Sequence, residues 1–222
     1  MKMKMSKNFN LLILAGALVL CLAMYMGLIY APRERTMGDV QRIFYVHVPS
    51  AWVSFLAFFV VFLASISYLK TSDERWDILG SSSAEVGLIF CTLALVTGSL
   101  WAKPVWGIFW TWDIRLTTTL VLWFIYVAYL ILRSHTEGGG APKFAAVFGI
   151  VGFLDVPIVY FSVRWWRTMH PGHMVGYKGG LDPKMLSSLV VSVIAFTMIF
   201  ALLLAVRASI KTIERRVESS EN

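Results

Sequence analysis

Long apolar runs separated by short polar segments set the organisation of this chain. The runs cover approximately residues 10–30, 50–69, 84–101, 116–132, 144–163 and 185–206. Each is close to the ~20 residues that a helix needs to cross the hydrocarbon core of a bilayer. Backbone polar groups in lipid must be paired within the protein, which favours helices there. The pattern predicts an all-α integral membrane protein with six transmembrane helices, in which residues 1–222 form a single domain.

Composition and the start of the chain agree with this prediction. The 222 residues are 58% hydrophobic, with a mean hydropathy of +0.69, which is more apolar than a soluble domain of this length. Lys2, Lys4 and Lys7 followed by an apolar run resemble a signal peptide. That run is long enough to span a bilayer and lacks a convincing small-residue cleavage pattern, so we expect a retained first helix.

The distribution of charge favours cytoplasmic termini. The net charge is +7, and an even number of helices places both termini on one side, with 11 of the 20 basic residues. Together with the basic N-terminus, this favours cytoplasmic termini under the positive-inside rule. The other side is nevertheless rich in basic residues, which suits either an anionic ligand or lipid headgroups. The nine basic residues of that side are Arg33, Arg35, Arg42, Lys103, Arg115, Arg164, Arg167, Lys178 and Lys184.

Several functional classes find no support in the sequence. Cys21 and Cys91 lie inside apolar runs, and there is no Cys-x-x-Cys or Cys-x-x-Cys-His. The chain is therefore unlike a disulfide oxidoreductase or a c-type cytochrome. There is no Walker sequence, so any dependence on ATP is expected to reside in a partner. No zinc-finger spacing or long basic run indicates a nucleic-acid partner.

A tryptophan-rich segment, residues 102–117, separates the third and fourth predicted helices. If it is helical, Trp106, Trp110 and Asp113 share one face; if it is extended, Trp110 and Trp112 do. Either arrangement offers an aromatic surface for a large flat ligand. The alternative is that these tryptophans only anchor the helices at the membrane boundary. The charged members are Asp113, a candidate partner of Arg115 or of a tryptophan indole, and Arg115 and Lys103, candidate partners of ligand carboxylates.

Histidines flank this segment on the same predicted side of the membrane. His47 lies just ahead of the second helix, whose first turn is expected to contain Pro49, and His170 follows the fifth helix. Two neutral imidazoles approaching from opposite sides suit the axial positions of a heme iron. The alternative is that each is a hydrogen-bonded boundary residue. His173 is an alternative to His170, whereas His135 is expected to be solvated on the opposite side.

Asp155 is a further candidate, because a carboxylate inside a membrane span is costly without a role. Proton relay, a supporting contact and helix packing all remain open for it. Pro157, two residues later, is expected to break the helix nearby.

Taken together, these motifs resemble the CcmC family, six-span members of the heme-handling superfamily of cytochrome c biogenesis. The superfamily is defined by a WWD domain flanked by histidines. Residues 106–117 match Trp-Gly-x-x-Trp-x-Trp-Asp-x-Arg-Leu-Thr, with Ala94–Ser99 and Lys103-Pro104 leading into it. One histidine block ends His47-Val48-Pro49 and the other ends at His170. The resemblance covers about residues 40–190, with departures at Phe109, Ile114 and Pro171.

The resemblance implies a heme-delivery protein in the bacterial inner membrane, with both termini cytoplasmic. Heme b would be held transiently and non-covalently at the periplasmic face, with His47 and His170 as axial ligands. Delivery would be to the periplasmic chaperone CcmE, with CcmA and CcmB as the ATP-binding-cassette pair and the small membrane protein CcmD as a stabilising subunit. Any covalent bond would form on the chaperone, so no classical enzyme activity is expected. The residues implied in heme contact are Trp106, Trp110, Trp112, Asp113, Arg115 and Lys103.

Two other hypotheses remain open. One is a heme-exporting permease subunit of an ABC-type transporter, which requires polar or ionisable residues along a path at mid-depth. Asp155 is the clearest candidate for such a path. The other is a structural assembly subunit that binds no heme.

Overall fold

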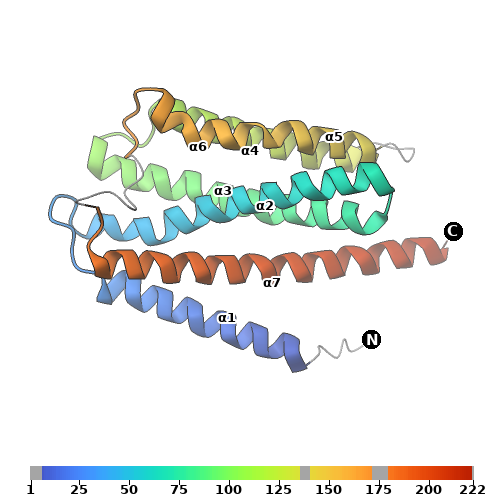
Figure 1. Cartoon of the computed structure of the whole chain (residues 1–222), viewed down its shortest axis with the longest axis horizontal. Coiled ribbons are helices and arrows are strands. Elements are labelled where there is room, and N and C mark those ends of the chain that lie inside the picture. The colour runs from blue at the N-terminus through green and yellow to red at the C-terminus, as the bar shows by residue number, and fades with distance from the viewer. Residues whose placement is uncertain (1–6, 136–140, 172–179, 222) are drawn as a thin grey trace.

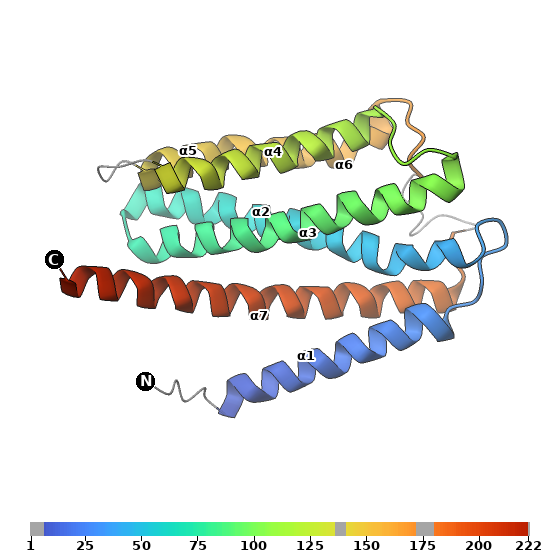
Figure 2. The same cartoon turned by 180° about the vertical axis from the view of Figure 1, so that it is seen from behind.

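The computed structural model is a bundle of long helices, and it describes residues 7–135, 141–171 and 180–221 (Figures 1 and 2). The described part of the chain is all-helical apart from its connections. Its elements are α1 (Lys7–Tyr25), a π-helical turn η1 (Met26–Tyr30), a 3-10 helix η2 (Asp39–Ile43), α2 (Phe44–Thr71), α3 (Glu74–Trp106), α4 (Ile114–His135), α5 (Ala141–Phe153), α6 (Asp155–Trp165) and α7 (Pro183–Glu221).

The prediction of six membrane-spanning helices is confirmed. The stretches long and apolar enough to cross a membrane are Phe9–Tyr30, Asp39–Thr71, Glu74–Trp106, Ile114–Arg133, Pro142–Trp165 and Pro183–Ser220. Several helices exceed the predicted apolar runs. α3 has 33 residues, about 50 Å of helix, whereas the hydrocarbon core measures about 30 Å. The helices therefore continue beyond the apolar runs from which they were predicted.

The fifth span is divided into two helices at Leu154. α5 ends at Phe153 and α6 begins at Asp155, with the Leu154 amide donating to the Val151 carbonyl at 3.1 Å. Pro157 is the third residue of α6, where its missing N–H removes no intrahelical hydrogen bond. The expected break near Pro157 is present. It places the Asp155 carboxyl group at a helix N-terminus, where a negative charge is favoured.

α2 and α3 form the centre of the bundle. They run antiparallel through a tight turn in which Ser72 has φ 55° and Asp73 accepts a hydrogen bond from the Arg75 amide at 2.9 Å. α4, α5 and α6 cover one side of this pair, α7 covers the other, and α1 packs outside α7 (Figures 1 and 2). A Cβ at Gly87 would lie 2.7 Å from that of Ala57. Glycine therefore allows the close approach of α2 and α3.

The two ends of the bundle carry different parts of the chain. Both termini lie at one end, as an even number of spans requires (Figure 1). The connections from α1 to α2 and from α3 to α4 lie at the opposite end, as does the described part of the connection from α6 to α7 (Figure 1). The two predicted histidine sites and the tryptophan-rich segment are in or beside these connections, so they share one end of the bundle.

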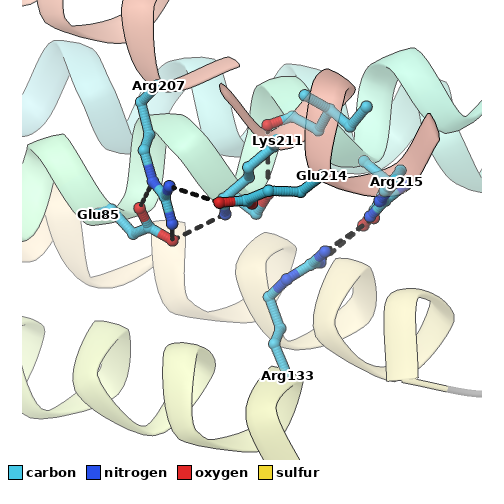
Figure 3. Close-up of polar contacts among 9 residues, drawn as sticks. Glu85, Arg133, Arg207, Lys211, Glu214 and Arg215 are labelled. Atoms are coloured by element: carbon cyan, nitrogen blue, oxygen red, sulfur yellow. Dashed lines mark hydrogen bonds and ion pairs between the residues drawn. The ribbon is translucent and has the colours of Figure 1, made fainter. Parts of the chain in front are cut away.

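An ionic network joins α3, α4 and α7 toward the terminal end. The Asp77 side chain is 3% exposed and accepts hydrogen bonds from Arg133 at 2.6 and 2.7 Å, and Arg215 also pairs with it. Nearby, Glu85 pairs with Arg207 and with Lys211, the latter at 2.7 Å. Figure 3 shows both groups of contacts. A buried charge is tolerated when paired in this way but is costly when its partner is removed.

Asp77→Asn is expected to destabilise the protein by about 3 kcal/mol, because it leaves two arginines without their shared buried carboxylate. The measurement is the thermal unfolding midpoint in lipid nanodiscs. The matched control is Glu74→Gln, since Glu74 also pairs with Arg215, at 2.6 Å, but has a side chain that is 62% exposed. Exposed pairs contribute little, so equal shifts for the two variants would contradict this account.

Candidate functional site

A cavity of about 990 Å³ lies at the end of the bundle opposite the termini. Its walls come from α2, α3, α4, α6 and α7 and from described parts of the α1–α2, α3–α4 and α6–α7 connections. The volume is at the upper end of the range of about 300–1,000 Å³ found for small-molecule sites. The predicted site residues that line it are His47, Trp106, Trp110, Arg115 and His170.

His47 is fixed by hydrogen bonds to α3. Its Nδ1 lies 3.0 Å from the Ala94 carbonyl oxygen and 3.2 Å from the Thr97 hydroxyl. A carbonyl oxygen only accepts, so Nδ1 carries the proton and Nε2 keeps its lone pair. A Cβ at Gly98 would lie 3.1 Å from the Cε1 of His47. Ala94, Thr97 and Gly98 were not predicted as site residues, although they belong to the motif that leads into the tryptophan-rich segment.

The predicted position of His47 relative to its helix is wrong. From the sequence, we expected His47 to lie ahead of the second helix and Pro49 to lie in its first turn. In the structure α2 begins at Phe44, so His47 is helical and Pro49 lies inside the helix. The preceding 3-10 helix, Asp39–Ile43, leads directly into α2. Pro49 has no N–H to donate to a preceding carbonyl, so α2 has one hydrogen bond fewer near its start.

His170 lies in the non-helical segment that follows α6. Its Nδ1 is 2.8 Å from the Pro171 carbonyl oxygen, which again leaves Nε2 as the nitrogen with a free lone pair. The ring centroids of His47 and His170 are 6.3 Å apart, with 38° between their planes. An imidazole nitrogen lies about 2 Å from a transition-metal ion that it binds, so two axial imidazoles on one ion have ring centres about 6 Å apart. The observed spacing fits that requirement.

Asp113 connects the tryptophan-rich segment to the His170 segment. It immediately precedes α4, and its Oδ1 accepts from the Arg115 amide at 3.0 Å, in the manner of a helix cap. Oδ1 also accepts from the Thr168 hydroxyl at 2.6 Å, and Oδ2 accepts from the Met169 amide at 2.9 Å. The contact expected between Asp113 and Arg115 is thus made through the backbone of Arg115. Asp113 does not line the cavity.

The tryptophan-rich segment is helical only at its ends. Trp106 is the last residue of α3, and Gly107, with φ 82°, ends the helix. The helical alternative, with Trp106, Trp110 and Asp113 on one face, is therefore excluded. Trp110 and Trp112 contact edge to face with centroids 5.8 Å apart. Trp112 is 77% exposed and does not line the cavity.

Two aromatic details at the cavity were not predicted. The buried Trp110 Nε1 has no hydrogen-bond partner among the described residues. Trp101 also lines the cavity and packs edge to face on Trp106, with centroids 5.3 Å apart. Trp101 lies five residues before Trp106, within a run assigned to the third helix, and helical neighbours are three or four residues apart, so spacing alone did not predict this contact.

The basic residues divide between the cavity and the outer surface. Arg115 is half-buried in the cavity wall, and none of the ion pairs among the described residues involves its guanidinium. Lys103 is exposed, does not line the cavity, and donates to the Gly107 carbonyl at 2.9 Å. The other charged residues that line the cavity are Arg33, Glu34, Arg35, Arg164 and Asp182.

The whole chain matches a known protein family. The model of the CcmC family, described as heme exporter protein C, matches residues 2–222. Heme exporter protein C of Bradyrhizobium diazoefficiens is 36% identical over 208 residues, which cover 92% of this chain and 79% of the relative. That of Escherichia coli K12 is 34% identical over 197 residues, 88% of this chain and 80% of the relative. The chain belongs to the CcmC family.

A plant relative extends this comparison. A ccmC-like mitochondrial protein of Marchantia polymorpha, whose name refers to cytochrome c biosynthesis, is 38% identical over 149 residues, 67% of this chain and 63% of the relative. The resemblance to the CcmC family inferred from the motifs is thereby confirmed.

Three other candidate residues of this CcmC-family chain are not placed at the cavity. His173 and the side chain of His135 lie outside the described residues. Asp155 does not line the cavity, and its buried Oδ2 has no hydrogen-bond partner in the part of the chain that the structure describes. Its role therefore stays a prediction.

The pKa of the His170 imidazole is lowered from 6.5 to about 4, first by burial and then by the positive charge of Arg115. The ring is thus neutral near pH 7 and able to bind a metal ion. Between pH 6.5 and about 4 the unfolded chain binds a proton that the folded chain does not. Acidification through this window therefore lowers the free energy of unfolding.

NMR titration of the ligand-free protein in nanodiscs is expected to give a His170 midpoint near pH 4. A His170→Gln variant assigns the signal. Arg115→Gln removes one of the causes that lower the pKa of His170, so its midpoint should rise while staying below 6.5, because burial remains. A wild-type midpoint near 6.5 would show that the folded site does not disfavour protonation.

Proposed function

We propose that this chain binds heme b non-covalently and transiently in the cavity, with Nε2 of His47 and of His170 as the axial ligands. The observation that carries the proposal is the 6.3 Å spacing of the two imidazoles. In addition, each Nδ1 is engaged by a backbone carbonyl. Metal-binding histidines commonly donate their second ring nitrogen in this way, which fixes the tautomer and the ring orientation.

The remaining lining residues support a flat, apolar ligand with acidic groups. Trp106 and Trp110 supply aromatic wall, and the Arg115 guanidinium supplies a cation without an ion pair among the described residues. The carboxylates of a porphyrin would complement that cation. The names of the bacterial relatives refer to heme export, which agrees with a heme ligand for this chain.

The proposed role is delivery of heme to the chaperone CcmE at the periplasmic face of the bacterial inner membrane. CcmA, CcmB and CcmD are the proposed partners. The cavity lies at the end opposite the termini, and the positive-inside rule favours cytoplasmic termini, so a periplasmic cavity agrees with both. Iron in such a site would supply two exchangeable coordination bonds. Ligation, stacking and ionic contacts are then separate interactions that a partner can disturb in turn.

The position of the cavity favours delivery over passage through the bilayer. Its lining from α2 extends no further than Phe55, and its lining from α6 begins at Val159. Asp155, the candidate for a polar path at mid-depth, is not part of it. A permease would need such a path to continue toward the terminal end.

His47→Ala and His170→Ala are each expected to remove or shift the Soret absorption of heme co-purified with the protein from heme-replete cells. The physical reason is the loss of one of two iron ligands. His135→Ala is the control, because His135 ends α4 at the opposite end of the bundle, and it should leave the spectrum unchanged. Loss of heme only in His135→Ala would refute the site. A colourless wild-type protein would favour a structural assembly subunit.

A further inference from the structure

One carboxylate ties the aromatic wall of the cavity to the segment that carries the second histidine. We infer that Asp113 is a positioning residue that holds His170 at the cavity by binding the His170 segment. This inference rests on the proposed role of His170 as a heme ligand. It assigns Asp113 a task other than contact with the ligand, because its side chain does not line the cavity.

The His170 segment depends on Asp113 for its placement. The segment is non-helical from Trp166 to Pro171, and only the Trp166 amide still donates back to α6, at 3.0 Å to the Ser162 carbonyl. Beyond Trp166, every hydrogen bond that links described residues of this segment to another element ends on Asp113. The segment would otherwise be attached to the bundle only through its chain ends and side-chain packing.

A relay of hydrogen bonds runs from Asp113 to the backbone of His170. Asp113 Oδ1 accepts from the Thr168 hydroxyl at 2.6 Å, and that hydroxyl accepts from the His170 amide at 3.1 Å. Asp113 Oδ2 accepts from the Met169 amide, the residue directly before His170, at 2.9 Å. Two successive residues ahead of the imidazole are thus held by one side chain.

The chemistry of this arrangement requires a carboxylate. Three donors converge on Asp113, namely the Arg115 amide, the Thr168 hydroxyl and the Met169 amide. An ionised carboxylate has only acceptors and serves all three, whereas an asparagine would turn an NH₂ group toward at least one of them. Hydrogen bonds to a charged acceptor are also stronger than neutral ones.

The hydrogen bonds of Asp113 connect two parts of the cavity wall. Trp110 lines the cavity three residues before Asp113, and His170 lines it beyond Met169. His47 belongs to a different element and has its own hydrogen bonds to α3. Loss of the Asp113 carboxylate should therefore weaken ligation by His170 and leave ligation by His47 in place.

The test compares Asp113→Asn with Asp73→Asn in the full-length protein loaded with heme in nanodiscs. Asp73 is a matched control because it caps α3 through the Arg75 amide at 2.9 Å but lies at the terminal end, away from the cavity. Asparagine also caps helices well, so both variants should unfold at similar temperatures. Only Asp113→Asn is expected to convert six-coordinate to five-coordinate heme and to speed heme loss by about tenfold.

Adding imidazole distinguishes the loss of His170 as a ligand from disruption of the whole heme site. It should restore the six-coordinate spectrum of Asp113→Asn, because the position left by His170 can accept a free imidazole while His47 remains bound. Thr168→Val removes the relay hydroxyl at nearly constant volume, and it should produce the same change more weakly. This second variant tests the positioning role if Asp113→Asn fails to fold.

The outcomes distinguish the inference from the function on which it depends. If Asp113→Asn and Thr168→Val keep the wild-type spectrum and rate of heme loss while His170→Ala does not, the positioning role is overturned and the heme site stands. The positioning role is also overturned if imidazole does not restore the spectrum of folded Asp113→Asn. If His47→Ala and His170→Ala both bind heme like the wild type, the proposed function itself fails.

Discussion

The site depends on two imidazoles that are held close together with their Nδ1 atoms already engaged. For His47, the acceptors are the Ala94 carbonyl and the Thr97 hydroxyl of α3, and for His170 the acceptor is the Pro171 carbonyl. Each ring therefore keeps one defined nitrogen free without any rearrangement of protons. A nearby cation and a buried setting both disfavour the imidazolium form of His170, so the pair suits a metal centre better than an acid–base role near pH 7.

The two histidines are supported very differently, and this difference affects how a ligand could leave. His47 lies in a long helix at the centre of the bundle, where its ring contacts α3 beside Gly98. His170 lies in a short irregular segment whose placement depends on a carboxylate from another part of the chain. Local opening of proteins begins where few contacts hold the backbone. We therefore expect a bound ligand to begin to leave from the His170 side of the cavity.

Much of the fold was predictable because lipid imposes a simple pattern on sequence. Six apolar runs predicted the six membrane-spanning stretches of the described residues, the fifth of which is divided into two helices, and the parity of that number placed the candidate segments at one end. Helix ends were less predictable, because polar residues continue a helix when partners from other helices satisfy them. The first turns of α3 carry Asp77, which is paired with Arg133 and Arg215, and no apolar run reveals such long-range partners.

The candidate site shows the same division between local and long-range information. The motifs identified both histidines, two tryptophans and Arg115 as residues of one cavity. They did not reveal that Lys103 and Trp112 do not line it. Trp112 follows Gly107, which ends α3 in a left-handed conformation and redirects the chain. The partners of Asp113 were also beyond sequence reasoning. Thr168 and Met169 follow it by 55 and 56 residues, and no helical or strand periodicity links positions that far apart.

The position of α1 has a consequence for biosynthesis. α1 packs chiefly against α7 (Figure 2), which lies more than 150 residues later in the chain, so α1 is synthesised well before its main neighbour. Domains generally fold in the order of their synthesis, but α1 can take up its native packing only after α7 has been synthesised. A chain terminated before α7 would therefore leave α1 without its main packing partner.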